Sequence, residues 1–146
     1  VVNKIDVMEY FDFDPEKVIE YARMRNPEIE IIFVSAKSGQ RIDKIFEMIN
    51  DVDSQNSKRI PTGLINDVLA EAIQITQPPS DKGRRLKVYY MTQVSTRPPT
   101  FVIFVNSKQL MHFSYVRYIE NHLRKQFGFS GTPIHMIIRE RKNGDK

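Results

Sequence analysis

The net charge changes sign once along the 146 residues, and this change constrains the possible folds most. Residues 1–57 hold seven Lys and Arg against twelve Asp and Glu, a net charge of −5. Residues 58–146 hold fifteen against six, a net charge of +9. A change this abrupt indicates two modules with different partners. The polar run at residues 53–57 marks the boundary, so we expect an acidic domain over residues 1–53 and a basic domain over residues 54–146.

The composition excludes several classes of protein. Hydrophobic residues make up 40% and charged residues 27%, which is ordinary for a globular chain. The absence of Cys excludes disulfide scaffolds, thiol nucleophiles and the common zinc modules, and it fits a reducing compartment. No apolar run approaches the ~20 residues that span a bilayer. The three His residues are too scattered for a metal site or a catalytic base, so we expect neither a metal site nor a catalytic residue in this chain. From the absence of Cys and of a long apolar run, we expect a cytoplasmic protein without membrane contact.

The acidic domain has the pattern of an α/β fold. Val1 and Val2 read as the end of a buried strand, and Asp14-Pro15-Glu16 reads as a capped helix start that runs to Asn26. Residues 29–34 are rich in β-branched side chains and predict a central parallel strand. Apolar residues then recur at helical spacing over 42–52. The resulting order, strand–helix–strand–helix, is typical of doubly wound sheets, which bind ligands beyond the carboxyl ends of their strands.

Both loops at these carboxyl ends carry a recognisable motif. Asn3-Lys4-Ile5-Asp6 resembles the guanine motif of P-loop GTPases, and Ser35-Ala36-Lys37 resembles their second base-contacting loop. Each motif alone is a weak signal, but the two follow successive predicted strands about 30 residues apart. The alternative is that Asn3 and Asp6 only form a strand-to-loop turn, as Asn and Asp commonly do.

The chemistry of these residues suits guanine. The Asp6 carboxylate can accept from both the ring N–H and the exocyclic amine of guanine, a donor pair that adenine lacks. The Lys4 and Lys37 stems can cover the two faces of the base, Asn3 can tie the loops together, and the Ala36 N–H can donate to the guanine oxygen. We therefore expect a guanine site made of Asn3, Lys4, Asp6, Ser35, Ala36 and Lys37.

The phosphate-binding parts of a GTPase do not occur among the 146 residues. The sequence contains no Gly-x-x-x-x-Gly-Lys-Ser/Thr loop and no switch segment to orient water. We therefore expect a P-loop GTPase remnant, a fragment that holds the guanine edge of GTP or GDP weakly and does not hydrolyse GTP alone. Tight nucleotide and Mg²⁺ binding would need the missing G-domain portions of a parent protein, which become expected partners.

The basic domain has the element order α-β-β-α-β. A helix is predicted from near Pro61 until Pro78-Pro79, a strand from Leu86, and a strand over residues 100–105 that is apolar on both faces and therefore central. A helix follows over residues 112–126, and a last strand over residues 133–139. We expect an α+β sandwich in which two helices cover one face of a small sheet.

This order is close to that of a K-homology (KH) RNA-binding domain, and the sequence resembles one family in particular. The motifs are RIPTGLIN at 59–66, GRRLKVYY at 83–90, TQV at 92–94, RPPTF at 97–101, FVN at 104–106 and GTPI at 131–134. They resemble the C-terminal KH-like domain of the Der (EngA) family, bacterial GTPases with two tandem G domains that are implicated in large ribosomal subunit assembly. Residues 43–53 resemble the end of the second G domain of that family. Residues 1–35, and 12–34 above all, also resemble the hydrogenase nickel-insertion GTPase.

The resemblance implies GTP-dependent binding to the large ribosomal subunit and its rRNA. Cations at strand entries and exits are the candidates for phosphate contact. They are Lys82, Arg84, Arg85, Lys87, Arg97, Arg124, Lys125, Arg139, Arg141 and Lys142. Two alternatives remain open: a merely solvated basic face, and a protein-interaction module that regulates the G domains without binding RNA.

Two further features bear on RNA binding. Gly128-Phe129-Ser130-Gly131 has the spacing of the KH phosphate clamp. A helix cap at Gly128, with Phe129 packed back on the core, explains it better. Among the strand aromatics, we expect Tyr90 and Phe101 in the core and only Tyr89 as a candidate for base stacking.

Overall fold

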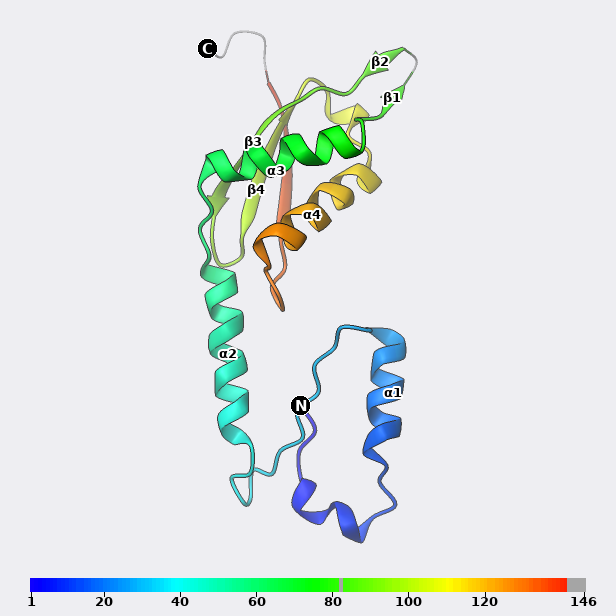
Figure 1. The fold of residues 1–146 in the computed structure, drawn as a ribbon, viewed down its shortest axis with the longest axis vertical. Helices are drawn as coiled ribbons and strands as arrows, with labels where there is room; N and C mark the ends of the chain where they lie inside the picture. The colour runs from blue at the N-terminus through cyan, green and yellow to red at the C-terminus, as the bar shows by residue number, and fades with distance from the viewer. Residues whose placement is uncertain (82, 142–146) are drawn as a thin grey trace. The chain divides into compact units, whose positions relative to one another are not determined.

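The structure is a computed structural model that describes residues 1–81 and 83–141 (Figure 1). The chain divides into two compact units, Val1–Asp51 and Val52–Lys146. The helix α2 (Ile42–Ser57) begins in the first unit and ends in the second. The predicted boundary between residues 53 and 54 therefore falls inside a helix.

The first unit contains the 3₁₀ helix η1 (Ile5–Tyr10), the helix α1 (Pro15–Arg25) and the start of α2. The predicted N-cap of α1 is confirmed, because Asp14 Oδ1 accepts from the backbone N–H of Glu16 at 3.0 Å and of Lys17 at 3.3 Å. These two bonds, and the nearby Lys17 charge, hold the pKa of the Asp14 carboxyl below its ordinary value.

The two predicted strands of this unit are wrong in extent. They pair only at one parallel bridge, between Val2 and Phe33, with hydrogen bonds of 2.8 Å from Val2 N to Ile32 O and from Val34 N to Val2 O. Lys4 turns the chain into η1 soon after this bridge, so the pairing does not continue beyond it. Val34 is nevertheless buried, with 2% of its surface exposed, and the bridge fixes the loops that follow each segment.

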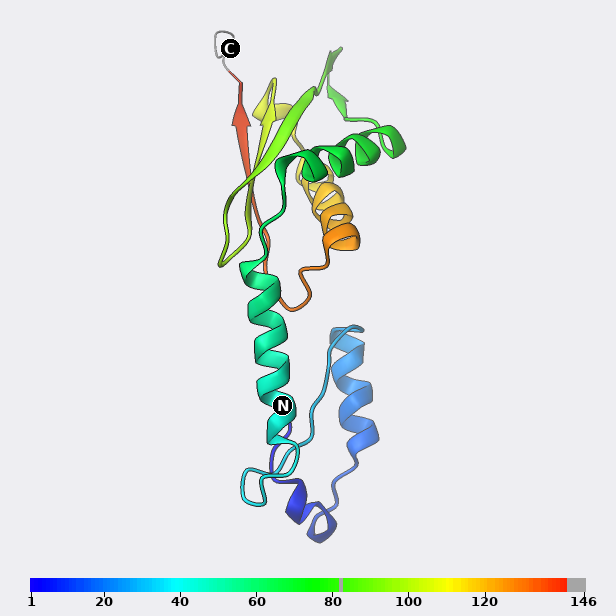
Figure 2. The same cartoon turned by 60° about the vertical axis from the view of Figure 1, so that its left-hand side comes forward.

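The second unit has the predicted order, α3-β3-β4-α4-β5, with one small hairpin added. The central strand β4 pairs antiparallel with β3 and parallel with β5. α3 and α4 both lie on one face of this sheet, as expected (Figure 2). The elements are α3 (Thr62–Ile75), β1 (Ser80–Asp81), β2 (Arg84–Arg85), β3 (Val88–Ser95), β4 (Thr100–Val105), η2 (Lys108–Leu110), α4 (Phe113–Phe127) and β5 (His135–Glu140).

The core of the second unit lies between the helices and the sheet. Ile65 and Leu69 of α3 and Ile119 and Leu123 of α4 are buried against Phe101, Ile103 and Val105 of β4. Four of the six residues of β4 are fully buried, which confirms that residues 100–105 form the central strand. The hydrophobic effect of this burial holds the two layers together.

The predicted helix cap at Gly128 is also confirmed. Gly128 adopts φ 87° and its N–H donates to the Arg124 carbonyl, which ends α4. The Phe129 ring is fully buried and contacts Phe101 edge-on, with 5.9 Å between ring centroids. This Gly-x-x-Gly segment is therefore a packed turn, because a phosphate clamp would need its backbone open to a ligand.

The polar run at residues 53–57 is helical and belongs to the second unit, which begins at Val52. Its side chains are used within the second unit: Gln55 Oε1 accepts from Phe129 N at 3.0 Å, and Asp53 pairs with Arg97 at 3.0 Å. Asn56 O accepts from Arg97 N at 2.9 Å. These polar groups therefore bind loops of the second unit.

Candidate functional site

Hydrogen bonds join the two predicted base-contacting loops of the first unit. Asn3 Oδ1 accepts from Ala36 N at 3.1 Å and from Lys4 N at 2.7 Å. Ser35 Oγ donates to Asp6 Oδ1 at 2.5 Å, and the Ser38 N–H donates to Ser35 Oγ at 3.2 Å. Residues 3–6 and 35–38, about 30 positions apart in sequence, therefore form one constellation of side chains.

The Asp6 carboxyl has a lowered pKa, which favours its ionised, hydrogen-bond-accepting form. The hydroxyl of Ser35, whose residue is fully buried, donates to it and is the main reason that the pKa of Asp6 lies below its ordinary value. The charges of Lys37 and Lys4 act in the same direction, and together these effects outweigh the opposing effect of burial. Asp6 is therefore ionised at neutral pH.

The backbone at Lys4 is strained. Lys4 lies in the left-handed region at φ 67° and ψ 36°, which costs a non-glycine residue roughly 1–3 kcal/mol. The bond from its N–H to Asn3 Oδ1 helps to hold this conformation. It turns the chain directly from the Val2 bridge into η1, so that Asp6 meets Ser35.

One predicted contact of the site is different in the structure. The Ala36 N–H, predicted to donate to a guanine oxygen, donates to Asn3 instead. A base could receive this N–H only if the Asn3 side chain gave it up. Asp6 is an ionised carboxylate acceptor, and the charges of Lys4, from its own loop, and Lys37, from the other loop, act on it.

In the second unit, five of the predicted cations lie near one end of the three-stranded sheet, three of them at its strand ends and two in the β1–β2 hairpin that precedes β3. β3 starts where β4 and β5 end, since Val88 is opposite Val105 and Val105 is opposite Glu140. Lys108, in η2, was missed by the sequence prediction, although its position just after β4 places it at this end too. The five predicted cations are Arg84, Arg85, Lys87, Arg139 and Arg141.

The structure places the remaining candidates elsewhere. Arg97 is in the loop between β3 and β4, at the opposite end of the sheet, where it pairs with Asp53. Arg124 bonds to Glu120 at 2.9 Å and donates to the carbonyls of Phe129 and Thr132 at 3.0 Å, which makes it a structural residue of the α4 C-terminus. Lys125 is exposed on α4. Lys82 and Lys142 lie outside the described residues.

The prediction that Tyr90 is buried is wrong. An irregularity in the β3–β4 register between Val88 and Tyr90 changes which side chains face the core. Met91 and Gln93 are buried on the helical side, whereas Tyr90 is 38% exposed on the other side. A β-bulge of this kind inserts one residue and inverts the alternation that follows it.

Among the described residues, 1–81 and 83–141, no helix is long and apolar enough to cross a membrane. Over the same residues, no group of three or more His, Asp or Glu side chains is arranged to hold a metal ion.

Comparison with known proteins agrees with this architecture. Residues 59–139 match the model of the KH-domain-like C-terminal domain of EngA bacterial GTPases. A relative named GTPase Der from Agathobacter rectalis is 60% identical over 82% of this chain. Another GTPase Der, from Alkaliphilus oremlandii, is 51% identical over 99% of this chain. The second comparison includes residues 1–35, for which the sequence also indicated a resemblance to the hydrogenase GTPase. The chain spans 27% and 34% of the lengths of these relatives. The chain therefore belongs to the EngA (Der) family, and residues 59–139 form its C-terminal KH-like domain.

Proposed function

We propose that the chain combines two functions of a GTP-binding protein. The first unit is the guanine-recognition end of a P-loop GTPase domain. The second unit contacts rRNA of the large ribosomal subunit during its assembly in the cytoplasm. The missing G-domain portions supply phosphate and Mg²⁺ binding and complete the GTPase.

The observation that supports guanine recognition by the first unit is the pairing of the two loops. Asn3 is hydrogen-bonded to Ala36, and Asp6 is hydrogen-bonded to Ser35. A simple strand-to-loop turn at residues 3–6 would need no partner 29 to 33 residues away. The bonds orient one carboxylate beside two lysines, which suits a base with adjacent N–H donors.

The cations near the end of the sheet support the proposed contact of the second unit with rRNA. Phosphate contact needs several positive side chains on one surface, and Arg84, Arg85, Lys87, Arg139 and Arg141 come from neighbouring strand ends. A protein that neutralises five phosphates of a single strand loses affinity with salt at a slope of roughly −3.5. This slope separates RNA contact from a merely solvated basic face.

Guanine recognition is tested by saturation-transfer NMR with GMP and AMP at millimolar concentrations. GMP should receive saturation from the chain, and AMP should receive much less, because adenine offers no donor pair to Asp6. The matched variant is Asp6→Asn, whose amide can still accept from Ser35 but presents one donor and one acceptor to the base. Equal signals from GMP and AMP, or an unchanged GMP signal in the variant, would contradict guanine recognition by Asp6.

Contact with rRNA is tested by filter binding to rRNA fragments over a salt series. We expect binding at low salt that weakens steeply as salt increases. Absence of binding at low salt, or a flat response, would remove the RNA function and leave the protein-interaction alternative.

A further inference from the structure

One face of the three-stranded sheet is not covered by any described element of the second unit. The helices α3 and α4 occupy the opposite face, where Met91 and Ile103 are buried (Figure 2). Side chains alternate along a strand, so the neighbours of these core residues point to the uncovered face. We call this face the open face; its central residues are Tyr90, Thr92, Val102, Phe104, Ile137 and Arg139, of which Val102 is only 2% exposed, Thr92 and Phe104 are half-buried, and the other three are exposed.

Strand register arranges these residues in two rows across the sheet. Tyr90 is opposite Phe104, and Phe104 is opposite Arg139. In the adjacent row Thr92 is opposite Val102, and Val102 is opposite Ile137. Neighbouring strands are about 4.8 Å apart, so one row places two aromatic rings and a guanidinium within roughly 10 Å.

The aromatic pair in the first row is stacked and partly accessible. The rings of Tyr90 and Phe104 are stacked, with 4.4 Å between their centroids and 15° between their planes. Tyr90 is 38% exposed and Ile137 is 40% exposed. A solvated sheet face usually alternates with polar residues, so a contiguous apolar and aromatic face indicates a binding surface.

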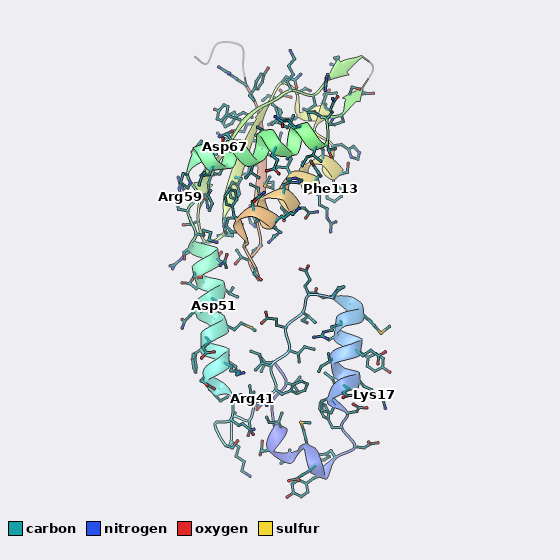
Figure 3. All side chains as sticks on the ribbon, viewed as in Figure 1. Lys17, Arg41, Asp51, Arg59, Asp67 and Phe113 are labelled. Carbon is teal, nitrogen blue, oxygen red and sulfur yellow. The ribbon has the colours of Figure 1, made fainter. Side chains whose placement is uncertain are left out.

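The charge on this face favours an anionic partner. Arg139 ends the aromatic row, and the Arg141 guanidinium lies 5.6 Å from the centre of the Tyr89 ring. The one acid in β3, β4 and β5 is Glu140, which accepts from the Lys108 N–H at 2.6 Å. Asp67 projects from α3 in the helical layer (Figure 3). The open face thus combines stacked rings with cations and carries no carboxylate in its two rows.

Nucleic acid matches this combination better than an apolar protein surface does. A flat ring stack offers a base the contact that every nucleobase can make, and a flanking guanidinium can bind the phosphate. An apolar protein partner would instead have to bury Arg139 without a countercharge, which is costly. The packed Gly128–Gly131 turn is not available as a clamp, so RNA contact needs a different surface.

We propose that the open face binds single-stranded RNA, with a base stacked on the Tyr90–Phe104 pair and a phosphate held by Arg139. This inference rests on the proposed contact with RNA and adds the surface and the mode: stacking on the sheet, in unpaired RNA.

The test is fluorescence anisotropy of a short fluorescein-labelled single-stranded RNA of mixed sequence, titrated with the chain and its variants. Tyr90→Leu keeps an apolar strand residue and removes the ring, so it should weaken binding about 5- to 100-fold with little change in salt slope. Arg139→Gln should weaken binding and reduce the salt slope by about 0.7. Hydrogen–nitrogen NMR spectra verify that each variant is folded.

Matched controls lie on the helical layer. Phe113→Leu removes an exposed aromatic ring at the start of α4 (Figure 3), and Arg117→Gln removes an exposed cation of the same helix. Both should leave the affinity unchanged.

The outcomes separate this inference from the proposed function. If the unaltered chain binds RNA and Tyr90→Leu binds as tightly, the open face is not the RNA surface, and a protein becomes its better occupant. If the controls weaken binding as much as Tyr90→Leu and Arg139→Gln, contact is diffuse and the inference is also wrong. If the unaltered chain does not bind RNA at low salt, the proposed function fails together with it.

Discussion

Replacing the buried Gln93 with leucine should destabilise the second unit, because burial of the leucine side chain offsets only part of the lost hydrogen bonding. Gln93 is 2% exposed, and its side chain makes three hydrogen bonds to the backbone. Its Oε1 accepts from Ile60 N at 2.8 Å, and its Nε2 donates to Lys58 O at 2.9 Å and to Ser95 O at 3.2 Å. Gln93 thereby fixes the segment between α2 and α3 to the strand β3.

The expected cost follows from the groups that Gln93→Leu would leave unpaired. A buried donor or acceptor without a partner costs about 1–3 kcal/mol, and the Ile60 N–H and Lys58 carbonyl both lose theirs. Burial of a leucine of similar size returns about 1 kcal/mol. The net loss should be about 1–5 kcal/mol, which is at least roughly 4 °C in Tm for a domain of this size.

Hydrogen exchange of the β4 amides is the appropriate assay, because β4 is central and its amides report opening of the second unit. The matched control is Gln109→Leu, an exposed position without such bonds, which should change stability by less than about 0.5 kcal/mol. A Gln93→Leu chain as stable as the control would refute the reasoning that these three bonds secure the segment.

Three further predictions concern single residues. Gly131→Ala should destabilise the second unit by about 1–3 kcal/mol in urea unfolding, because the added Cβ would lie 2.9 Å from Val52 Cγ2 and φ is +66°; additional Val52→Ala should not deepen the loss by its full separate cost. GMP titrations over a pH series should show binding at neutral pH that disappears as the pH falls through the pKa of Asp6, which lies below its ordinary value of 3.8. Ser35→Ala removes the hydrogen bond that lowers this pKa, so the variant should lose GMP binding at a higher pH. Arg97→Gln should leave RNA affinity in filter binding unchanged, since Arg97 lies at the end of the sheet away from the other cations; weakening equal to that of Arg139→Gln would contradict this placement.

Periodicity and capping predicted the order of the main elements in the second unit, although not the β1–β2 hairpin. The Gly128 cap and the strand over residues 100–105 are determined by local rules, namely left-handed φ at a helix end and burial on both faces of a central strand. The α4 helix starts at Phe113, with His112 as its N-cap, one residue after the predicted start.

The orientation of Tyr90 could not be predicted in the same way. Strict alternation from Leu86 places Tyr90 in the core, but the register irregularity after Val88 moves the following side chains to opposite faces. A bulge depends on pairing with β4, which the β3 sequence alone does not contain. The stacking of Tyr90 on Phe104 could therefore not be predicted from the sequence.

Composition also did not predict the conformation of residues 53–57, which are helical although the two units divide nearby, between residues 51 and 52. A polar run favours a linker when its groups face water, but Gln55 and Asp53 bind Phe129 and Arg97, which are distant in sequence. In the candidate guanine site, by contrast, the sequence predicted two loops that the structure does bring together, and the structure added that the Ala36 N–H is hydrogen-bonded to Asn3. Motif spacing predicts which loops meet, but not which donors their own side chains occupy.

The most direct test of the account is one ¹H–¹⁵N titration of the labelled chain, first with GMP and then with single-stranded RNA. The account predicts that GMP shifts the amides of residues 3–6 and 35–37, whereas RNA shifts those of β3, β4 and β5. Shifts by GMP that AMP reproduces, or RNA shifts confined to the helices α3 and α4, would contradict it.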